Sequence, residues 1–101
     1  MRRMSITTLS VLHAIRNGVA YGFDILDATG LESGTVYPIL SRIENDGLVR
    51  STWESERRAH ADGRPARRYY AITPAGKAEL ETATKHYAQL VPAFGRARRP
   101  R

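Results

Sequence analysis

The side chains best suited to chemistry lie in residues 31–49, LESGTVYPILSRIENDGLV. Apolar residues recur there at three- and four-residue spacing and so share one face of a predicted helix. These residues are Val36, Ile39, Leu40 and Ile43. The other face carries an aromatic ring, a hydroxyl group and a guanidinium, on Tyr37, Pro38, Ser41, Arg42 and Asn45. One face of this helix is apolar, and the other carries hydrogen-bond donors and a positive charge. Such a helix is typical of an element that is inserted into a partner.

The ends of this helix are predicted from its flanking residues. Pro38 lacks a backbone N–H and costs a hydrogen bond if it lies beyond the first turn. We therefore place the N-cap between Ser33 and Thr35. Asp46 and Gly47 end the helix, because glycine readily adopts the left-handed turn that closes a helix.

Positive charge is concentrated in two segments. The formal net charge is +6, but residues 95–101, GRARRPR, hold four arginines and no acid, and subtracting them leaves +2 for the rest. Residues 50–68 hold six arginines against three acidic residues. Arginines clustered in a loop indicate a polyanionic partner. The alternative is a solvated loop that only keeps the chain soluble.

Size and composition limit the class of protein. At 101 residues the chain has room for one domain with one core. It has no cysteine, which excludes disulfides and thiolate metal sites and is typical of a reducing compartment. No apolar run approaches the length of a membrane span, and the first residues lack the pattern of a secretory leader. We expect a cytoplasmic protein with no membrane partner.

Two further helices are predicted before residue 31. Ser5 can cap a helix over residues 6–16, which carries an apolar stripe. A short second helix is expected over residues 21–28, and its core residues are predicted to be Phe23, Ile25 and Leu26. Two helices joined by a tight connection make a helix-turn-helix, whose second helix can lie in a DNA major groove. The helix within residues 31–49 is therefore the candidate recognition helix.

A two-stranded hairpin is predicted after the recognition helix. The strand-like runs are residues 48–53 and 67–72, and residues 54–66 between them are polar with no apolar side chain larger than alanine. We interpret these middle residues as a long basic loop and expect Trp53 to pack at its base. The predicted fold class is mainly α with a small β-hairpin, a winged helix-turn-helix whose wing can reach the minor groove or the DNA backbone.

A last helix is predicted to begin at Thr73 and Pro74, a cap followed by a first-turn proline. Its apolar residues are spaced by three and four, as in a heptad seam that packs against another helix. The seam residues are Leu80, Ala83, Tyr87, Leu90 and Phe94. We expect a homodimer through this seam, with packing onto the chain's own core as the alternative. The predicted division is a DNA-binding domain at 1–73, a dimerisation helix at 74–94 and a basic disordered tail at 95–101.

Six short segments add up to a recognisable pattern. They are YGFDI at 21–25, GTVYPIL at 34–40, RIE at 42–44, DGLV at 46–49, RYY at 68–70 and ITPAG at 72–76. Together they resemble the PadR family of transcriptional regulators, over roughly residues 9–80. The resemblance implies a homodimeric winged helix that binds a pseudo-palindromic operator, usually as a repressor released by a small molecule or another signal.

The short C-terminal region is similar to that of the compact PadR subfamily. Some compact members bind flat aromatic drugs between tryptophans at the dimer interface, but the last helix here has no tryptophan. That mode is therefore not expected. Tyr87 and Phe94 can line a smaller pocket, although a packed seam is the preferred interpretation, and the effector stays unidentified.

The expected partner is double-stranded DNA. Arg42 is the candidate for a bidentate contact with guanine, and Tyr21 at the start of the second helix is placed to touch phosphate. One of Tyr69 and Tyr70 is expected in the core and the other near a phosphate, because they alternate across a strand. The other expected DNA contacts are Ser33, Thr35, Tyr37, Pro38, Ser41, Arg57, Arg58, Arg64 and Arg67.

Two other functions are weighed against DNA recognition. A winged-helix module that binds a protein, with only non-specific DNA binding, would explain the modest charge outside the tail. An enzyme is disfavoured, because His13, His60 and His86 come from different predicted elements and form no nucleophile, metal or phosphate-loop pattern. We expect no catalytic residue, no metal and no cofactor.

Overall fold

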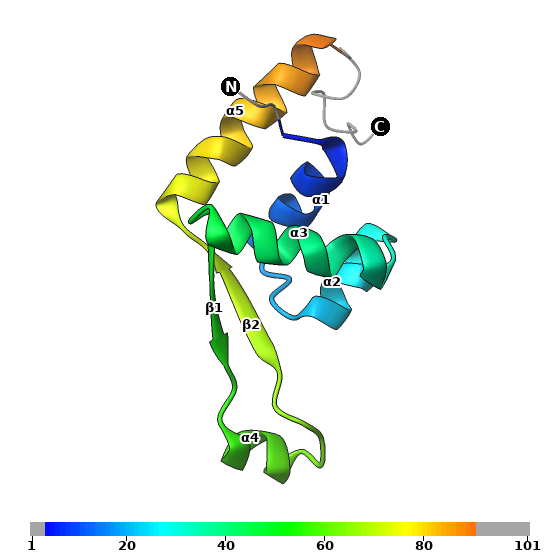
Figure 1. Cartoon of the computed structure of the whole chain (residues 1–101), viewed down its shortest axis with the longest axis vertical. Helices are drawn as coiled ribbons and strands as arrows, with labels where there is room; N and C mark the ends of the chain where they lie inside the picture. Colours follow the sequence, from blue (N-terminus) through cyan, green and yellow to red (C-terminus); the bar gives the residue numbers. More distant parts are fainter. Residues whose placement is uncertain (1–3, 91–101) are drawn as a thin grey trace, which may run out of the picture.

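The computed structural model describes residues 4–90 (Figure 1). In chain order its elements are α1 (Ile6–Arg16), α2 (Gly22–Thr29), α3 (Ser33–Asn45), β1 (Val49–Trp53), α4 (Glu56–Ala61), β2 (Arg68–Ile72) and α5 (Pro74–Leu90). Helices α1, α2, α3 and α5 gather into one body. The hairpin of β1 and β2, which carries α4 at its far end, projects from that body and is called the wing. The fold is the predicted winged helix-turn-helix.

Local signals set the ends of the first two helices. The Oγ of Ser5 accepts a hydrogen bond from the Thr8 N–H at 3.2 Å and so caps α1, as predicted. Helix α2 begins and ends one residue later than predicted, with Tyr21 as its N-cap. Gly30 closes α2 at a φ of 73°, a left-handed conformation that glycine adopts without a steric penalty.

The start of α3 differs from the prediction. Its N-cap is Glu32, one residue before the predicted range, so Pro38 is the sixth residue of the helix rather than part of its first turn. A proline at this position has no N–H to donate to the carbonyl of Gly34. Both residues are exposed, so solvent or a partner can reach that carbonyl.

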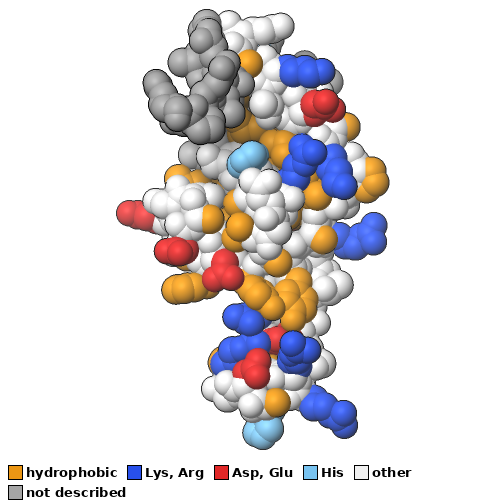
Figure 2. All heavy atoms as spheres, turned by 180° about the vertical axis from the view of Figure 1, so that it is seen from behind, with side chains coloured by type: hydrophobic (Ala, Val, Ile, Leu, Met, Phe, Trp, Pro, Cys, Tyr) orange, Lys and Arg blue, Asp and Glu red, His pale blue; other side chains and the backbone are white. Residues whose placement is uncertain are grey.

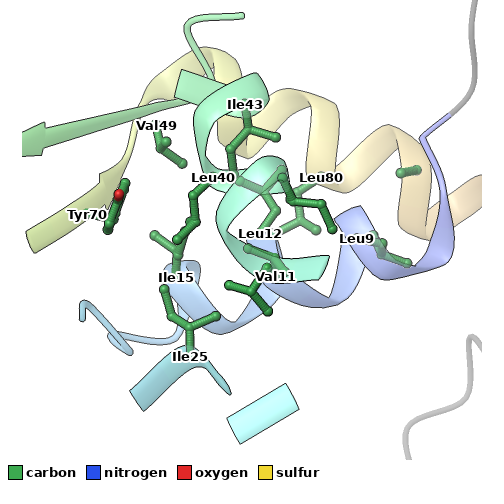
Figure 3. Packing of buried hydrophobic residues seen from close by; sticks show 13 residues of the cluster. Leu9, Val11, Leu12, Ile15, Ile25, Leu40, Ile43, Val49, Tyr70 and Leu80 are labelled. Atoms are coloured by element: carbon green, nitrogen blue, oxygen red, sulfur yellow. The ribbon is translucent and has the colours of Figure 1, made fainter. Parts of the chain in front are cut away.

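One hydrophobic core joins α1, α2, α3, α5 and the base of the wing (Figure 3). The predicted apolar face of α3 is buried in it completely, because its four residues recur at helical spacing and meet the stripe of α1. Phe23 corrects the prediction for α2, since its side chain is 74% exposed rather than in the core. The core residues are Leu9, Val11, Leu12, Ile15, Ile25, Val36, Ile39, Leu40, Ile43, Val49, Tyr70, Leu80 and Ala83.

The predicted seam on the last helix is partly wrong. Leu80 and Ala83 are 1% and 7% exposed and belong to the chain's own core. Tyr87 packs against the same core, and its hydroxyl donates a hydrogen bond to the Met4 carbonyl at 2.7 Å. Heptad spacing requires a second helix, and α1 of the same chain provides it. Leu90 is 63% exposed.

Three predictions for the last part of the chain lie outside the described residues. They are the end of the dimerisation helix at residue 94, the seam position Phe94 and the basic tail at 95–101.

The wing is regular at its base and helical at its tip. Strands β1 and β2 pair antiparallel, with Val49 opposite Ile72 and Trp53 opposite Arg68. The predicted long loop contains α4 instead, because the Oγ of Ser55 caps a short helical turn that buries Ala59. The second correction concerns Trp53, which is 64% exposed and not packed at the wing base.

Among residues 4–90, no helix has the length and apolarity needed to cross a membrane.

Candidate nucleic-acid interface

The outer face of α3 gathers six of the predicted DNA contacts on one exposed surface. These residues alternate with the buried positions of the helix, so core packing itself turns them outward. The six exposed residues are Ser33, Thr35, Tyr37, Pro38, Ser41 and Arg42. The face offers hydroxyl groups, a phenol and a single guanidinium, which suits hydrogen bonding to base edges and phosphates.

Arg42 lies at the edge of this face, beside the start of α1. Its Nη2 donates a hydrogen bond to the Oγ1 of Thr8 at 2.6 Å, and Ser5 donates to the same oxygen at 2.9 Å. Thr8 is buried, so the bond holds the guanidinium in a fixed orientation. Arg42 as a residue is exposed, and a guanidinium has five N–H donors, so donors remain for a partner.

Tyr37 is positioned by a close approach between α3 and α2. A Cβ at Gly22 would lie 2.7 Å from the Tyr37 hydroxyl oxygen, so a side chain at residue 22 would displace the ring from this position. The ring remains 47% exposed and faces the space between α2 and the wing.

Tyr21 and Arg67 join the wing to α2. The rings of Tyr21 and Tyr69 lie 4.7 Å apart, and the Cζ of Arg67 lies 3.8 Å from the centroid of the Tyr21 ring. The Tyr70 N–H also donates to the carbonyl of Ala20 at 2.8 Å. A hydrogen bond with Tyr21, together with burial, raises the pKa of Tyr69. Both predicted DNA contacts are thus half-buried and hold the wing in place.

Arg64 makes an internal ion pair in the wing. Its Nη2 donates to the Oε2 of Glu54 at 2.8 Å and to Asp62 at 3.0 Å, and Glu54 is only 6% exposed. Glu54 also accepts from the Arg67 N–H at 3.2 Å. The hydrogen bond from Arg64 lowers the pKa of Glu54 to about 2. Arg64 was expected on DNA, but its guanidinium is already engaged by these two carboxylates.

Arg57 and Arg58 are exposed on α4 at the wing tip. Within residues 4–90 neither forms an ion pair. Figure 2 shows arginine side chains gathered with acidic ones at the wing end of the molecule, and exposed hydrophobic side chains directly above them. These two arginines are therefore the wing charges most available to a phosphate.

Arg68 joins the opposite face of the hairpin to α3. Its Nε donates to the Ser51 hydroxyl at 2.9 Å, and its Nη2 lies 3.5 Å from the Oε1 of Glu44. Glu44 in turn accepts from the Ser51 hydroxyl at 2.6 Å. The Cζ of Arg68 lies 5.5 Å from the centroid of the Trp53 ring. The wing is thus fixed to the body from both faces.

A groove of 380 Å³ opens where α2, α3 and the wing meet. It is lined by Tyr21, Gly22, Phe23, Tyr37, Trp53, Arg67, Arg68 and Tyr70. Tyr70 is the tyrosine of the pair that enters the core, and burial raises its pKa.

Sequence reasoning missed three residues of this groove. The sequence predicts packing roles for Phe23 and Trp53, because an aromatic ring on a helix or strand usually buries its area. Arg68 belongs to the charged segment and to the RYY motif at 68–70, but neither feature places it in a site. A strand partner for Trp53 was predictable from the hairpin register, but the approach of α2 to the wing depends on tertiary packing.

The three histidines do not come together. His13 contacts the side chain of Asn17, His60 is exposed on α4, and His86 lies beside the ring of Tyr87. Across residues 4–90, no three histidine or acidic side chains are arranged to hold a metal ion.

Comparison with known proteins places this geometry in a family. Residues 11–82 match the model of the transcriptional regulator PadR-like family. The transcriptional regulator Rv3488 of Mycobacterium tuberculosis is 55% identical over 47 residues, which are 46% of this chain and 38% of that protein. The match thus spans well under half of the relative's length.

Solved structures share the fold. A PadR-like transcription factor from Bacteroides fragilis superposes with a TM-score of 0.71 at 26% identity, covering 87% of this chain and 85% of that one. BpsR of Bordetella bronchiseptica, whose DNA binding is regulated by 6-hydroxynicotinic acid, gives a TM-score of 0.72 at 22% identity and covers 97% of this chain and 70% of that one. A PadR family regulator from Clostridium difficile gives 0.73 at 23% identity, covering 88% and 93%.

Proposed function

This chain belongs to the PadR-like family of transcriptional regulators, a family of DNA-binding transcription factors and not of enzymes, and we propose that it represses transcription as a cytoplasmic homodimer bound to a pseudo-palindromic operator. The observation that carries the proposal is the exposed polar face of α3 beside a wing whose tip holds Arg57 and Arg58 without ion-pair partners among the described residues. A recognition helix supplies base contacts and a basic wing supplies phosphate or minor-groove contacts.

Base reading is assigned to the outer face of α3. Arg42 contacts guanine, because its guanidinium is held by Thr8 and keeps free N–H groups for the O6 and N7 acceptors. Tyr37, Ser41 and Thr35 contribute hydrogen bonds to neighbouring bases or phosphates.

The dimer contact is assigned to the end of the molecule that lies away from the wing. The start of α1 and the end of α5 both lie there (Figure 1), and they expose Ile6 at 45% and Leu90 at 63%. Apolar side chains exposed at one end favour a second copy as the partner. With Leu80 and Ala83 inside the core, Leu90 carries the seam, together with Tyr87 and with Phe94 beyond the described residues.

Release by a signal is proposed through the same contact. The spacing of the two α3 helices in a dimer depends on how the α5 helices meet, so a ligand bound near Tyr87 changes that spacing. Regulation of BpsR by a small aromatic acid is in line with this proposal. Structures with and without an effector that keep the same α3 spacing would refute it.

The decisive experiment is selection of random duplexes at physiological salt, with the full chain and with a chain lacking residues 95–101. Both are expected to enrich an inverted repeat with half-sites about one helical turn apart. A confirmed dimer that enriches no sequence would instead favour a winged-helix module for protein partners. DNA binding that is lost entirely when the basic tail is removed would also favour the module for protein partners.

A variant separates base reading from backbone contact. Arg42→Ala is expected to cost about 1–3 kcal/mol of binding free energy and to relax the preference at one base pair. An equal loss across all sequences would assign Arg42 to phosphate. Arg16→Ala is the matched control, because Arg16 is exposed at the end of α1 and lies outside the proposed interface.

A further inference from the structure

Exposed aromatic rings are concentrated at one place on the molecule. Five large hydrophobic side chains are exposed within residues 4–90, and three of them line the groove between α2, α3 and the wing. They are Phe23, Tyr37 and Trp53, at 74%, 47% and 64% exposure. The other two lie on α1 and α5. Large apolar groups gathered on one surface mark a site that a partner covers.

The charge of the groove defines the chemistry of that partner. None of its lining residues is acidic, and two are arginines. Arg68 is partly neutralised by Glu44. Arg67 has no carboxylate within ion-pair distance in the described part of the chain, and its Nε is buried without a hydrogen-bond acceptor. The occupant therefore brings a negative charge to Arg67 and apolar surface to the rings.

We propose that this groove seats one stretch of the DNA sugar–phosphate backbone, with a phosphate on Arg67 and the deoxyribose against Phe23 and Trp53. The inference rests on the proposed function, which puts α3 in the major groove and the wing at the neighbouring minor groove. A DNA strand lies between these two grooves, and Tyr37 and Trp53 stand on the two sides of the space it must occupy. A DNA strand offers both an anionic phosphate and the apolar face of a sugar, and the groove offers a guanidinium for the first and aromatic rings for the second.

Other occupants fit less well. A wholly apolar ligand leaves Arg67 without a counter-charge, and a simple inorganic anion leaves the three rings exposed. A small aromatic anion satisfies both kinds of group, and it is therefore treated as an outcome of the experiment.

Trp53 is the sole tryptophan of the chain and reports directly on the groove. Its fluorescence is measured in the unmodified full chain, with acrylamide as quencher, before and after addition of a selected duplex. Binding itself is followed separately by the anisotropy of a dye on the DNA. We expect acrylamide quenching of Trp53 to fall when the duplex is bound, because the deoxyribose covers the ring.

Two matched variants test the phosphate. Arg67→Met keeps a stem that can lie on Tyr21 but removes the charge, and it is expected to reduce the slope of log affinity against log salt by about 0.9. Arg50→Met removes an exposed arginine that lies opposite Ala71 in the same hairpin and does not line the groove, and it is expected to leave the slope unchanged. Phe23→Ala, at a side chain outside the core, is expected to weaken binding without lowering the melting temperature.

The outcomes separate the groove from the wider function. A duplex that binds with sequence preference while Trp53 stays equally quenchable, or while Arg67→Met keeps the full slope, overturns the backbone seat and leaves the regulator intact. If no duplex binds, the proposed function itself is overturned. Shielding of Trp53 by millimolar benzoate without DNA, with release of bound duplex, would assign the groove to a small aromatic anion and overturn the proposal.

Discussion

Replacing Leu80 tests whether α5 belongs first to the core or to a dimer. The side chain is 1% exposed and packs in the cluster shared with α1 and α3, so Leu80→Ala leaves a cavity that close-packed neighbours cannot fill. Substitutions of this kind cost about 3–4 kcal/mol of the free energy of unfolding. For a domain of this size that lowers the melting temperature by roughly 12–32 °C.

The assay combines urea unfolding with sedimentation of the native protein. Leu80→Ala is expected to lower the free energy of unfolding while leaving the dissociation constant of the native dimer unchanged. Leu90→Ala is the matched control, because Leu90 is 63% exposed: it should change stability by less than about 0.5 kcal/mol and weaken the dimer. If Leu80→Ala instead produced a stable monomer with unaltered unfolding energy, the assignment of Leu80 to the core would be refuted.

Three further outcomes are expected. Glu54 stabilises the wing through Arg64 only while its carboxylate is charged, and its pKa falls from 4.5 to about 2 on folding. Arg64→Met should therefore lower the melting temperature by its largest amount above pH 4.5, and this difference from wild type should disappear as the pH falls toward 2. A difference that stays constant over this range would contradict that role. Gly76→Ala should cost about 1–3 kcal/mol in urea unfolding, because its Cβ would collide with the carbonyl oxygen of Leu48; an unchanged midpoint would mean that the first turn of α5 can shift. Pro38→Ala should add about 2 kcal/mol to the free energy of unfolding, since it removes the lost hydrogen bond and the ring clash that together cost about 3 inside a helix and gives back up to about 1 in unfolded-chain entropy; a neutral result in the same assay would mean that the ring contributes packing.

Patterns confined to one element were sufficient to predict most of the fold. Ser5 caps α1 and Gly30 closes α2 because caps depend on bonds within a few residues of each other. The buried face of α3 followed from spacing alone. The hairpin strands were predicted to within one residue at each end.

Features that depend on contacts between elements were not predictable in the same way. The spacing of Leu80 and Ala83 indicates that a helix packs on them, but it does not say whether that helix belongs to the same chain. Phe23 falls at a position that suits a core residue, yet α3 does not cover it. The helix at the wing tip depends on one cap, Ser55, and one buried residue, Ala59, within a segment whose composition is that of a loop.

The arginines of the wing show why composition overstates the charge offered to DNA. Arg64 and Arg68 are engaged by carboxylates, which cancel much of their field at a phosphate. Arg57 and Arg58 at the tip and Arg67 in the groove have no ion-pair partner within residues 4–90, and neither has Arg50, which lies outside the proposed interface. Counterion release depends on phosphates actually neutralised, so the salt dependence of this wing should be that of three contacts rather than of every arginine in the segment. Removing Glu44 would free Arg68 for DNA, but it would also loosen a contact that holds the wing beside α3. Removing Glu54 would free Arg64, but it would loosen contacts inside the wing itself.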